Sequence, residues 1–345
     1  MTIIKRIALI AMIIGLSQNS FAQGNVNTMA TPPAYRSVFV NDLTNLLYAT
    51  QGLLALKLSN LIISQTNNCD EFASNGICAQ IGARYSELSA PKITSKSIVF
   101  NSSYQLSNQW YVGAYIDAGN ISSQPSITYV NQKGYDPIIG AYSEYKNRIW
   151  GTPYNFRLGA NTGSTSLDIS TPSLGNLGSL SRDLNVKAQS YLALLSTNIA
   201  VDPKLAIAPY IGTTYTAMNI DGSNNNSSKL SNLPIIFNGV STEIFALQLG
   251  LNSVYRPNGS ILLGATAGIQ HTLSSNISNM TVSSLPGLSG YTGKTVLANN
   301  VPTFMALAKY KTYKNQELTA KIIYRQEVYQ RIGVTSYNLN YSIGF

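Results

Sequence analysis

Two cysteines and a single histidine are the scarcest reactive residues in this chain. Cys69 and Cys78 lie nine positions apart, and the segment between them is polar and contains a glycine. In an oxidising compartment such a pair predicts a small disulfide loop. A metal site would need more ligands, and His271 is remote in sequence. We therefore expect a disulfide between Cys69 and Cys78, no metal site and no cofactor.

A catalytic centre would have to use His271 as its base. General-base chemistry needs a nucleophile or a carboxylate beside the imidazole, and no carboxylate lies near Gln270-His271-Thr272 in the sequence. The carboxylates in the predicted strands are better explained by ion pairing: the acids are Asp117, Glu144, Asp168 and Glu243, and the candidate bases are Arg84, Arg157, Lys187, Lys321 and Arg325. We expect no enzymatic activity.

The composition excludes several classes of protein. Charged residues make up 11% of the 345 residues, against about 25% in soluble globular domains. The hydrophobic fraction is 44%, with no apolar run of the roughly 20 residues that a membrane-spanning helix needs. With 23 Lys and Arg and no supporting motif, nucleic-acid binding is not expected. The abundance of Ser, Thr, Asn, Gly and Tyr favours β structure with one polar and one apolar face.

The first residues predict an export signal. Lys5 and Arg6 give a positive start, Ile7–Leu16 is a short apolar stretch, and Ala22 is a suitable cleavage position. We expect a signal peptide over residues 1–22 and a short leader over residues 23–34. Loss of the two basic residues lowers the formal net charge from +9 to +7. A membrane anchor is the less favoured alternative, because the apolar stretch is too short.

A helix is predicted over Tyr35–Leu61. Its apolar residues recur at steps of three, four and seven, but Asn, Asp and Gln interrupt them, so the helix is expected to dock against protein or inside a partly wet cavity. The apolar positions are Phe39, Leu43, Leu46, Leu47, Leu53, Leu54 and Leu58. Residues 35–75 would hold this helix and the disulfide loop.

From Gly76 onward the hydrophobic period is two, which indicates strands. Twelve are predicted: Ile77–Ser86, Thr94–Leu106, Trp110–Ala118, Ile138–Asn147, Tyr154–Asp168, Asp183–Ala200, Leu205–Ile220, Thr242–Tyr255, Ser260–Thr272, Thr303–Thr312, Gln316–Gln330 and Thr335–Phe345. Many reach the roughly nine to eleven residues that a tilted membrane strand needs. Residues 76–345 would form the sheet.

The two faces of these strands differ in polarity more than in charge. In Gln316–Gln330, Leu318 and Ile322 share one face, while Thr319 and Lys321 share the other. A soluble sandwich also alternates, but its wet face would carry more charge. We therefore expect an all-β fold, an antiparallel transmembrane barrel of about twelve strands with lipid outside and small polar residues inside, and with the helix in or near its lumen.

Connection lengths support the barrel. Short links at Ser107–Gln109, Arg148–Pro153, Val201–Lys204, Arg256–Gly259 and Tyr313–Asn315 alternate with long ones at Gly119–Pro137, Ile169–Arg182, Asp221–Ser241 and Leu273–Pro302. Membrane barrels place short turns on the periplasmic side and long loops outside.

Tyrosines and positive charges suggest which parts of the predicted barrel face the membrane interfaces, the lumen and the rims. Tyrosines near strand ends favour aromatic belts at the membrane interfaces: Tyr111, Tyr115, Tyr142, Tyr145, Tyr154, Tyr210, Tyr255, Tyr310, Tyr313 and Tyr329. One set of cations would face the lumen and favour anions: Arg84, Arg157, Lys321 and Arg325. Another would meet lipid head groups or lipopolysaccharide at the rims: Lys309, Lys311, Lys314 and Arg331. We expect a mixture of the two roles.

With these features the sequence resembles the translocator barrel of autotransporters (type V secretion), over roughly Tyr35–Phe345. The most specific match is the terminal alternation of Tyr337, Leu339, Tyr341, Ile343 and Phe345. It is similar to the signal by which the barrel-assembly machinery recognises outer-membrane clients. In the family a helix threads the pore, so the resemblance implies this role for Phe39–Leu58. Autotransporters usually carry a long passenger ahead of that helix, and we expect no sizeable passenger here.

The expected function is translocation or transport across the outer membrane of a Gram-negative bacterium. The alternatives are a passive porin-like channel and a surface adhesin that binds a host or surface ligand through Asp221–Ser241 and Leu273–Pro302. The expected partners are outer-membrane lipid, lipopolysaccharide and the barrel-assembly machinery.

Overall fold

The computed structural model describes residues 33–89, 92–123, 129–134, 137–149, 151–170, 181–225, 235–278, 280–283, 291–293, 298–328 and 333–345. The predicted signal peptide, residues 1–22, lies outside the described residues, as does the leader up to residue 32.

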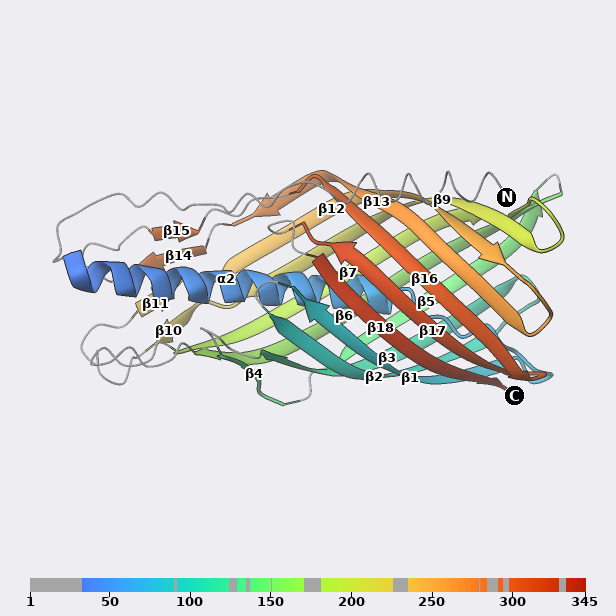
Figure 1. The fold of residues 1–345 in the computed structure, drawn as a ribbon, viewed down its shortest axis with the longest axis horizontal. Coiled ribbons are helices and arrows are strands. Elements are labelled where there is room, and N and C mark those ends of the chain that lie inside the picture. Colours follow the sequence, from blue (N-terminus) through green and yellow to red (C-terminus); the bar gives the residue numbers. More distant parts are fainter. Residues whose placement is uncertain are drawn as a thin grey trace.

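Within the described residues, twelve antiparallel strands close into a barrel (Figure 1). They are β1 (Ile77–Leu88), β2 (Ile93–Gln105), β3 (Trp110–Ser123), β5 (Ile138–Ile149), β6 (Thr152–Ser170), β7 (Ser181–Thr197), β9 (Leu205–Ile220), β12 (Val240–Tyr255), β13 (Ile261–Ile277), β16 (Asn300–Tyr313), β17 (Gln316–Gln326) and β18 (Gly333–Gly344). Successive strands pair with each other, and β1 pairs with β18 from Cys78 opposite Gly344 to Leu88 opposite Val334. The predicted twelve-stranded barrel is confirmed, with strand ends shifted by a few residues.

Short strands lie beyond the barrel proper. β4 (Tyr129–Gln132) pairs with β3 and β6, and β8 (Ile199–Ala200) pairs with β9. A separate four-stranded sheet comprises β10 (Ser223–Asn225), β11 (Ile235–Phe237), β14 (Met280–Ser283) and β15 (Tyr291–Gly293). This small sheet joins two connections that the sequence predicted only as long loops.

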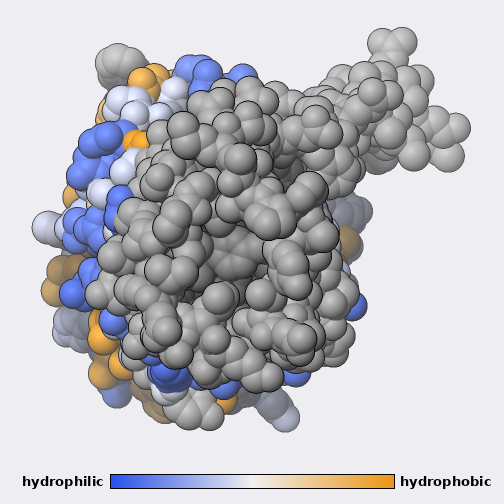
Figure 2. Space-filling model, turned by 90° about the vertical axis from the view of Figure 1, so that its left-hand side faces the viewer, coloured by the Kyte–Doolittle hydropathy of each residue, from blue (hydrophilic) through white to orange (hydrophobic). Residues whose placement is uncertain are grey.

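The two ends of the barrel differ. The short connections and the C-terminus lie at one end, here called the turn end (Figure 1). The small sheet of β10, β11, β14 and β15 lies at the other, here called the loop end. Viewed from the loop end, both hydrophilic and hydrophobic residues lie along the visible edge of the described part (Figure 2).

The outer wall is apolar. On β2, the outward side chains of Ile98 and Phe100 are 53% and 51% exposed, whereas the intervening Val99 and the inward Asn101 are buried. The same outward pattern recurs around the barrel at Ile81, Ile116, Ile139, Leu158, Ile211, Leu249, Ile322 and Leu339. Such a belt suits a lipid surface, where Arg or Lys costs about 2–4 kcal/mol at mid-depth.

The helix α2 (Pro33–Ser64) runs from the loop end into the barrel (Figure 1). Proline at its first position costs no internal hydrogen bond. Leu53, Leu54 and Leu58 are at most 2% exposed. The predicted positions Phe39, Leu43, Leu46 and Leu47 belong to the same helix, and their side chains lie outside the described part. Among the described residues, no helix combines the length and apolarity needed to cross a membrane.

The barrel interior is divided along its axis. At the loop end, inward positions of the strands are apolar and pack in one cluster around α2 residues Ala49–Ile62. We call these wall residues the collar: Leu88, Ile93, Ile121, Ile138, Leu167, Ile169, Leu184, Val186, Met218, Ile220, Val240, Ile244, Val301 and Val334. The predicted polar inner face is therefore interrupted by an apolar collar, although polar residues such as Ser86, Ser95 and Thr165 are also buried inward beside it. The collar contacts the leucine-rich surface of the helix, whereas the buried helix residues Lys57 and Asn60 line a small hollow together with polar wall residues such as Thr165.

Candidate functional site in the barrel lumen

The turn half of the lumen receives the C-terminal end of α2. The last four carbonyls of a helix have no partner within it and carry a partial negative charge. Arg157 of β6 supplies donors there, because its Nη2 atom lies 2.7 Å from the carbonyl oxygens of both Gln65 and Asn67. Its Nη1 atom donates to Glu144 at 3.3 Å, and its guanidinium lies 4.5 Å from the Tyr142 ring centre. The wall therefore anchors the chain leaving the helix.

Two further wall residues complete this cap. Asn161 donates from Nδ2 to the Leu61 carbonyl at 2.7 Å and to the Tyr115 hydroxyl at 2.9 Å. The Lys321 Nζ atom donates to the Thr66 carbonyl at 3.4 Å. The Leu61 carbonyl also accepts from the Gln65 amide at 3.3 Å, so Asn161 adds a side-chain donor to the last turn of the helix.

A buried ion pair holds the last helical side chain. Arg84 of β1 and Asp117 of β3 form a salt bridge, and both side chains are at most 2% exposed. Ser64 lies between them, accepting from Arg84 Nη1 at 2.8 Å and donating to Asp117 Oδ2 at 2.5 Å. Breaking such a pair costs roughly 3–5 kcal/mol because the remaining charge is buried alone.

The fourth predicted lumen cation, Arg325 of β17, lies closer to the loop end, opposite Val334 of β18. Arg325 donates from Nε to Glu327 at 3.0 Å and from Nη2 to Gln270 at 2.6 Å. Burial raises the pKa of Glu327 to about 7, although the charge of Arg325 opposes that shift. Arg84, Arg157, Lys321 and Arg325 are therefore all buried inward, and each contacts an acid, an amide or a backbone carbonyl. Their charge serves internal pairing more directly than anion attraction.

Only part of the predicted ion pairing forms among the described residues. Asp117 and Glu144 pair with Arg84 and Arg157. Lys187 and Glu243, in contrast, are exposed on the outer side of their strands. Sequence alternation alone did not separate inward from outward charges near the strand ends.

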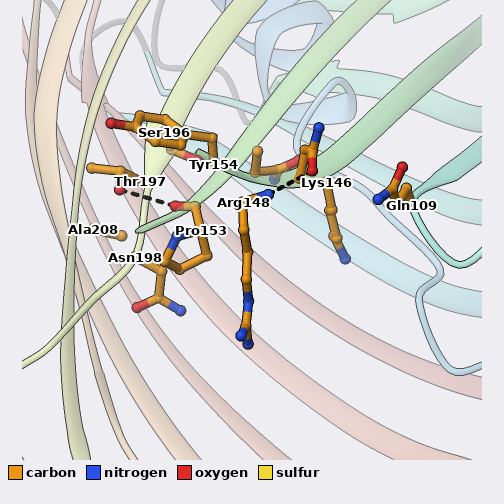
Figure 3. Close-up of a pocket in the computed structure, with 11 residues that line it drawn as sticks. Gln109, Lys146, Arg148, Pro153, Tyr154, Ser196, Thr197, Asn198 and Ala208 are labelled. Atoms are coloured by element: carbon orange, nitrogen blue, oxygen red, sulfur yellow. Dashed lines mark hydrogen bonds between the residues drawn. The ribbon is translucent and has the colours of Figure 1, made fainter. Parts of the chain in front are cut away.

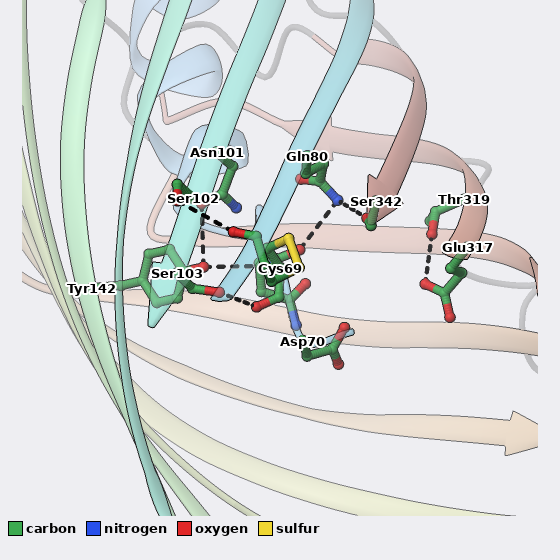
Figure 4. The surroundings of a disulfide bond; sticks show 12 residues. Cys69, Asp70, Gln80, Asn101, Ser102, Ser103, Tyr142, Glu317, Thr319 and Ser342 are labelled. Carbon is green, nitrogen blue, oxygen red and sulfur yellow. Dashed lines mark hydrogen bonds between the residues drawn. A yellow bond between two sulfur atoms is a disulfide. The ribbon is translucent and has the colours of Figure 1, made fainter. Parts of the chain in front are cut away.

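The segment after the helix crosses the turn half of the lumen as a tethered loop. Cys69 and Cys78 form a disulfide. Around it, Ser103 Oγ donates to the Cys69 carbonyl at 2.5 Å, and the Cys69 amide donates to the Tyr142 hydroxyl at 3.1 Å (Figure 4). Gln80 donates to the Asn68 carbonyl at 3.2 Å. The helix exit is thus fixed to β1, β2 and β5 at the same level.

Two acids tie this loop to β16. Lys309 Nζ lies 3.6 Å from Asp70 and 2.7 Å from Glu317, and Lys311 Nζ lies 3.0 Å from Glu71. Burial would raise the pKa of Asp70, but the charges of Lys309, Lys146 and Lys321 outweigh it and hold that pKa below its usual range. For Glu71 burial dominates, and its pKa is raised despite Lys311.

These contacts correct the expectation that Lys309 and Lys311 meet lipid head groups, since both point to protein acids. Lys314 is exposed, and Arg331 lies outside the described residues. Part of the predicted aromatic belt is also wrong, because Tyr111, Tyr115 and Tyr142 are buried inside, at 3%, 2% and 5% exposure.

The inward tyrosines have a structural reason. A Cβ atom at Gly140 would lie 2.3 Å from the Tyr115 ring, and one at Gly113 would lie 2.3 Å from the Tyr142 ring. Each ring therefore lies flat against a cross-strand glycine. This arrangement leaves the lumen wide enough for α2, which an upright tyrosine would obstruct.

Beside the tethered loop the lumen is hollow. A cavity of about 300 Å³ lies between Gln65 and the walls of β7, β9, β12, β13 and β16, and it reaches Gln270 and Arg325. A second cavity of about 590 Å³ opens among the turns of the turn end (Figure 3). Asn155 and Ser196 line both, so the two cavities are neighbours.

The terminal strand presents its alternate side chains outward. Tyr337, Leu339, Tyr341 and Phe345 are 43%, 53%, 37% and 49% exposed, and Ile343 is half-buried. The backbone of Phe345 closes the barrel edge, donating to Ile77 at 2.9 Å and accepting from Asn75 at 3.1 Å. This places the residues of the predicted assembly signal on the outer, accessible face.

His271 is exposed, and its Nδ1 atom lies 2.7 Å from Asn300 Oδ1. No group of three or more His, Cys, Asp or Glu side chains in the described part of the chain is placed to hold a metal ion.

A closed antiparallel barrel with an apolar outer belt and a helix inside its lumen defines the class of helix-filled outer-membrane barrels. The family model described as "Autotransporter beta-domain" matches residues 88–315. The chain belongs to this autotransporter β-domain family. The family places it in the outer membrane of Gram-negative bacteria.

Solved structures agree at the level of the fold. The translocator domain of the autotransporter NalP from Neisseria meningitidis is 14% identical with a TM-score of 0.59, covering 88% of this chain and 98% of that one. The β domain of the Bordetella autotransporter BrkA is 14% identical with a TM-score of 0.53, covering 78% and 99%. The transport unit of AIDA-I from Escherichia coli is 10% identical with a TM-score of 0.53, covering 84% and 98%. Comparison with curated protein sequences gives no match.

Several contacts of the site were not predicted. Asn161, Ser64 and Asp70 each hold the end of the helix or its loop. Alternation within the strand marks Asn161 as inward, but it does not give its partner. A signal was available in the helix itself, because a helix that ends inside a barrel must find donors for its last carbonyls.

Proposed function

We propose that this chain is an outer-membrane translocator whose own N-terminal region passes through the barrel to the cell surface. The direction of α2 carries the proposal. The helix begins at the loop end and ends at Ser64 inside the lumen, and β1 then starts at the turn end. With short turns on the periplasmic side, whatever precedes Pro33 emerges outside the cell.

The anchoring contacts support this function because they fix the helix after passage. Asn161 binds the Leu61 carbonyl in the last turn of the helix, and Arg157 and Lys321 bind carbonyls of the three residues that follow its end. A helix inserted in the reverse direction would present amide donors to Arg157 and Lys321 instead. The lumen is therefore complementary to one orientation of the chain.

The remaining assignments follow from this topology. We propose a signal peptide over residues 1–22, a leader over 23–34, a helix and disulfide loop over 35–75 and the barrel over 76–345. The outward residues of the last strand, ending at Phe345, would be read by the barrel-assembly machinery, and the apolar belt would contact outer-membrane lipid and lipopolysaccharide. We propose no catalytic role.

An epitope tag inserted between Thr31 and Pro32 tests the direction of the helix. On intact cells we expect antibody binding and cleavage by added protease. A tag inserted in the turn between Pro203 and Lys204 is the matched control and should stay hidden until the outer membrane is opened. If the first tag is detected only after opening, the proposed translocation is wrong.

The porin-like alternative requires a path past α2, and the adhesin alternative requires a ligand for the loops. Single-channel conductance addresses the first, and binding of labelled cells to host matrix before and after deletion of residues 226–230 addresses the second. The apolar contact between the collar and α2 favours the translocator over an open pore.

A further inference from the structure

We propose that the cavity of about 590 Å³ at the turn end, here called the mouth, binds a small water-soluble anion that carries a phosphate or carboxylate group together with hydroxyls. Its size lies in the range of ligand pockets. Lys146 and Arg148 of β5 bind the anionic group, and the amides around them bind the hydroxyls. The site stands on the geometry of the turn end, and only its assignment to the periplasm rests on the proposed function.

Strand alternation places the two cations of the mouth side by side. Tyr142 and Glu144 are buried on the inward face of β5, and residues two positions apart share a face, so Lys146 and Arg148 follow on that face. The contact of Lys146 agrees, since its Nζ atom lies 4.9 Å from the centre of the inward Tyr111 ring. Figure 3 shows both side chains extending in the same direction from the end of β5. Two neighbouring cations favour an anion beside them.

The one carboxylate on this part of the wall does not cancel their charge. Glu144 lies 3.6 Å from Lys146 Nζ, but it also pairs with Arg157 at 3.3 Å, so it serves two cations. Arg148 forms no salt bridge with a described residue. Across the strand pair it faces Pro153, which carries no charge. This part of the wall therefore keeps a net positive charge.

The other described acids near the mouth are engaged elsewhere. Both acids of the tethered loop pair with lysines of β16. Asp202 caps its own turn, where its Oδ1 atom accepts from the amides of Lys204 and Leu205 at 2.6 and 2.8 Å. Lys204 adds a further exposed cation at this end. An anion that enters the mouth thus meets cations that are not neutralised.

The rest of the wall suits hydroxyl groups. Lys146 lies opposite Asn155 of β6, and Asn155 lies opposite Ser196 of β7, so a cation, an amide and a hydroxyl form one row across three strands. The buried Oδ1 atom of Asn155 has no hydrogen-bond partner in the described structure. Such an acceptor favours a donor from water or from a ligand. The amides of Gln109 and Asn198 line the same cavity.

The inward direction of the cations selects a solute and not a lipid head group. On β5 the outward neighbour of Lys146 is Tyr145, which is 38% exposed and packs edge-to-face against Trp110. Aromatic residues of this kind lie at the membrane interface, so lipid meets the aromatic face and the cations face the lumen. Arginine binds phosphate or carboxylate through two parallel hydrogen bonds, and lysine adds a point charge.

Calorimetric titration of the purified full-length protein with glycerol 3-phosphate, in neutral detergent, tests the site. We expect saturable binding, and none of glycerol, which lacks the phosphate. Arg148→Gln should weaken binding about tenfold, since it loses a charge-assisted hydrogen bond, and Arg148→Lys should weaken it less because it keeps the charge. Lys314→Gln is the matched control, an exposed cation at the same end that does not line the mouth, and should bind like the wild type. No saturable binding by the wild type, or an equal loss in Lys314→Gln, would overturn the proposal.

Vesicles separate a soluble anion from a lipid head group. The wild type and Arg148→Gln are reconstituted in phosphatidylcholine with and without phosphatidylglycerol. The surface potential of the anionic lipid lowers the affinity for glycerol 3-phosphate by the same factor in both proteins, and we expect this result. A larger loss in the wild type would mean that head groups occupy the mouth, and would overturn the assignment to a solute. A surface-exposed epitope tag without anion binding refutes the site alone, whereas anion binding with a hidden tag refutes the proposed translocation alone.

Discussion

Replacing Arg157 by glutamine tests how the barrel wall holds the end of α2. The guanidinium donates to the carbonyls of Gln65 and Asn67, both at 2.7 Å, and pairs with Glu144. Glutamine keeps a donor but lacks the charge and the fork of the guanidinium. The substitution therefore weakens the docking of the helix and leaves the strands intact.

The structure sets the size of the effect. Hydrogen bonds that involve a charged group contribute about 1.5–3 kcal/mol each, and glutamine can replace one of the two. Glu144 does not remain unpaired, because Asn155 donates to it at 2.8 Å and Lys146 lies 3.6 Å away. We expect a loss of about 3 kcal/mol in the docking free energy, which raises the undocked population roughly a hundredfold, since about 1.4 kcal/mol is tenfold.

Native-state hydrogen exchange measures this population directly. Protection of the amides in Ala49–Ser64 should fall roughly a hundredfold, while β12 and β13 keep theirs. Arg157→Lys should give an intermediate loss, and Arg148→Gln, at the exposed turn rim, should give none. Unchanged protection in Arg157→Gln, or an equal loss in Arg148→Gln, would refute the role of this arginine.

Three further predictions concern the loop and the wall. Because the pKa of Asp70 is held below its ordinary value near 3.8, the ion pair with Lys309 stabilises the loop at higher pH and is lost as the pH falls through that lowered pKa. Hydrogen exchange over residues 65–76 should rise there, and Asp70→Asn should remove this rise at low pH. Replacing both Cys69 and Cys78 by serine should cost the loop about 2–3 kcal/mol, seen as faster proteolysis between residues 65 and 76 with the barrel still folded. Ile98→Arg on the outer belt should destabilise the protein by about 2–4 kcal/mol in urea, whereas Lys96→Arg, exposed on the same strand, should be neutral.

The strands and the outer belt could be predicted because lipid favours an apolar side chain at every outward position. Ile98, Phe100 and Leu339 are apolar for the same reason, so the period of two is visible through the whole barrel. The terminal alternation from Tyr337 to Phe345 was clear on the same ground.

The inner wall has an apolar collar and a polar part, and the sequence pattern could not tell these two parts from each other. On β7 both faces are apolar near Tyr191, Leu192 and Leu195, so polarity does not tell inside from outside. The collar was hidden for this reason, and so were the inward positions of Tyr115 and Tyr142. The partners of Arg157 and Lys321 are backbone carbonyls of a distant segment, which no pattern of side chains encodes.

The central claim is that α2 lies within the barrel with Ser64 against β3. Disulfide trapping tests it most directly, with the variant Ser64→Cys/Asp117→Cys assembled in the outer membrane. Ser64 Oγ lies 2.5 Å from Asp117 Oδ2, so mild oxidation should form a disulfide that joins α2 to β3. The control Ser64→Cys/Ile116→Cys uses the neighbouring outward residue, 47% exposed, and should not cross-link. Cross-linking of the control, or none in the first pair, would contradict a helix inside the lumen.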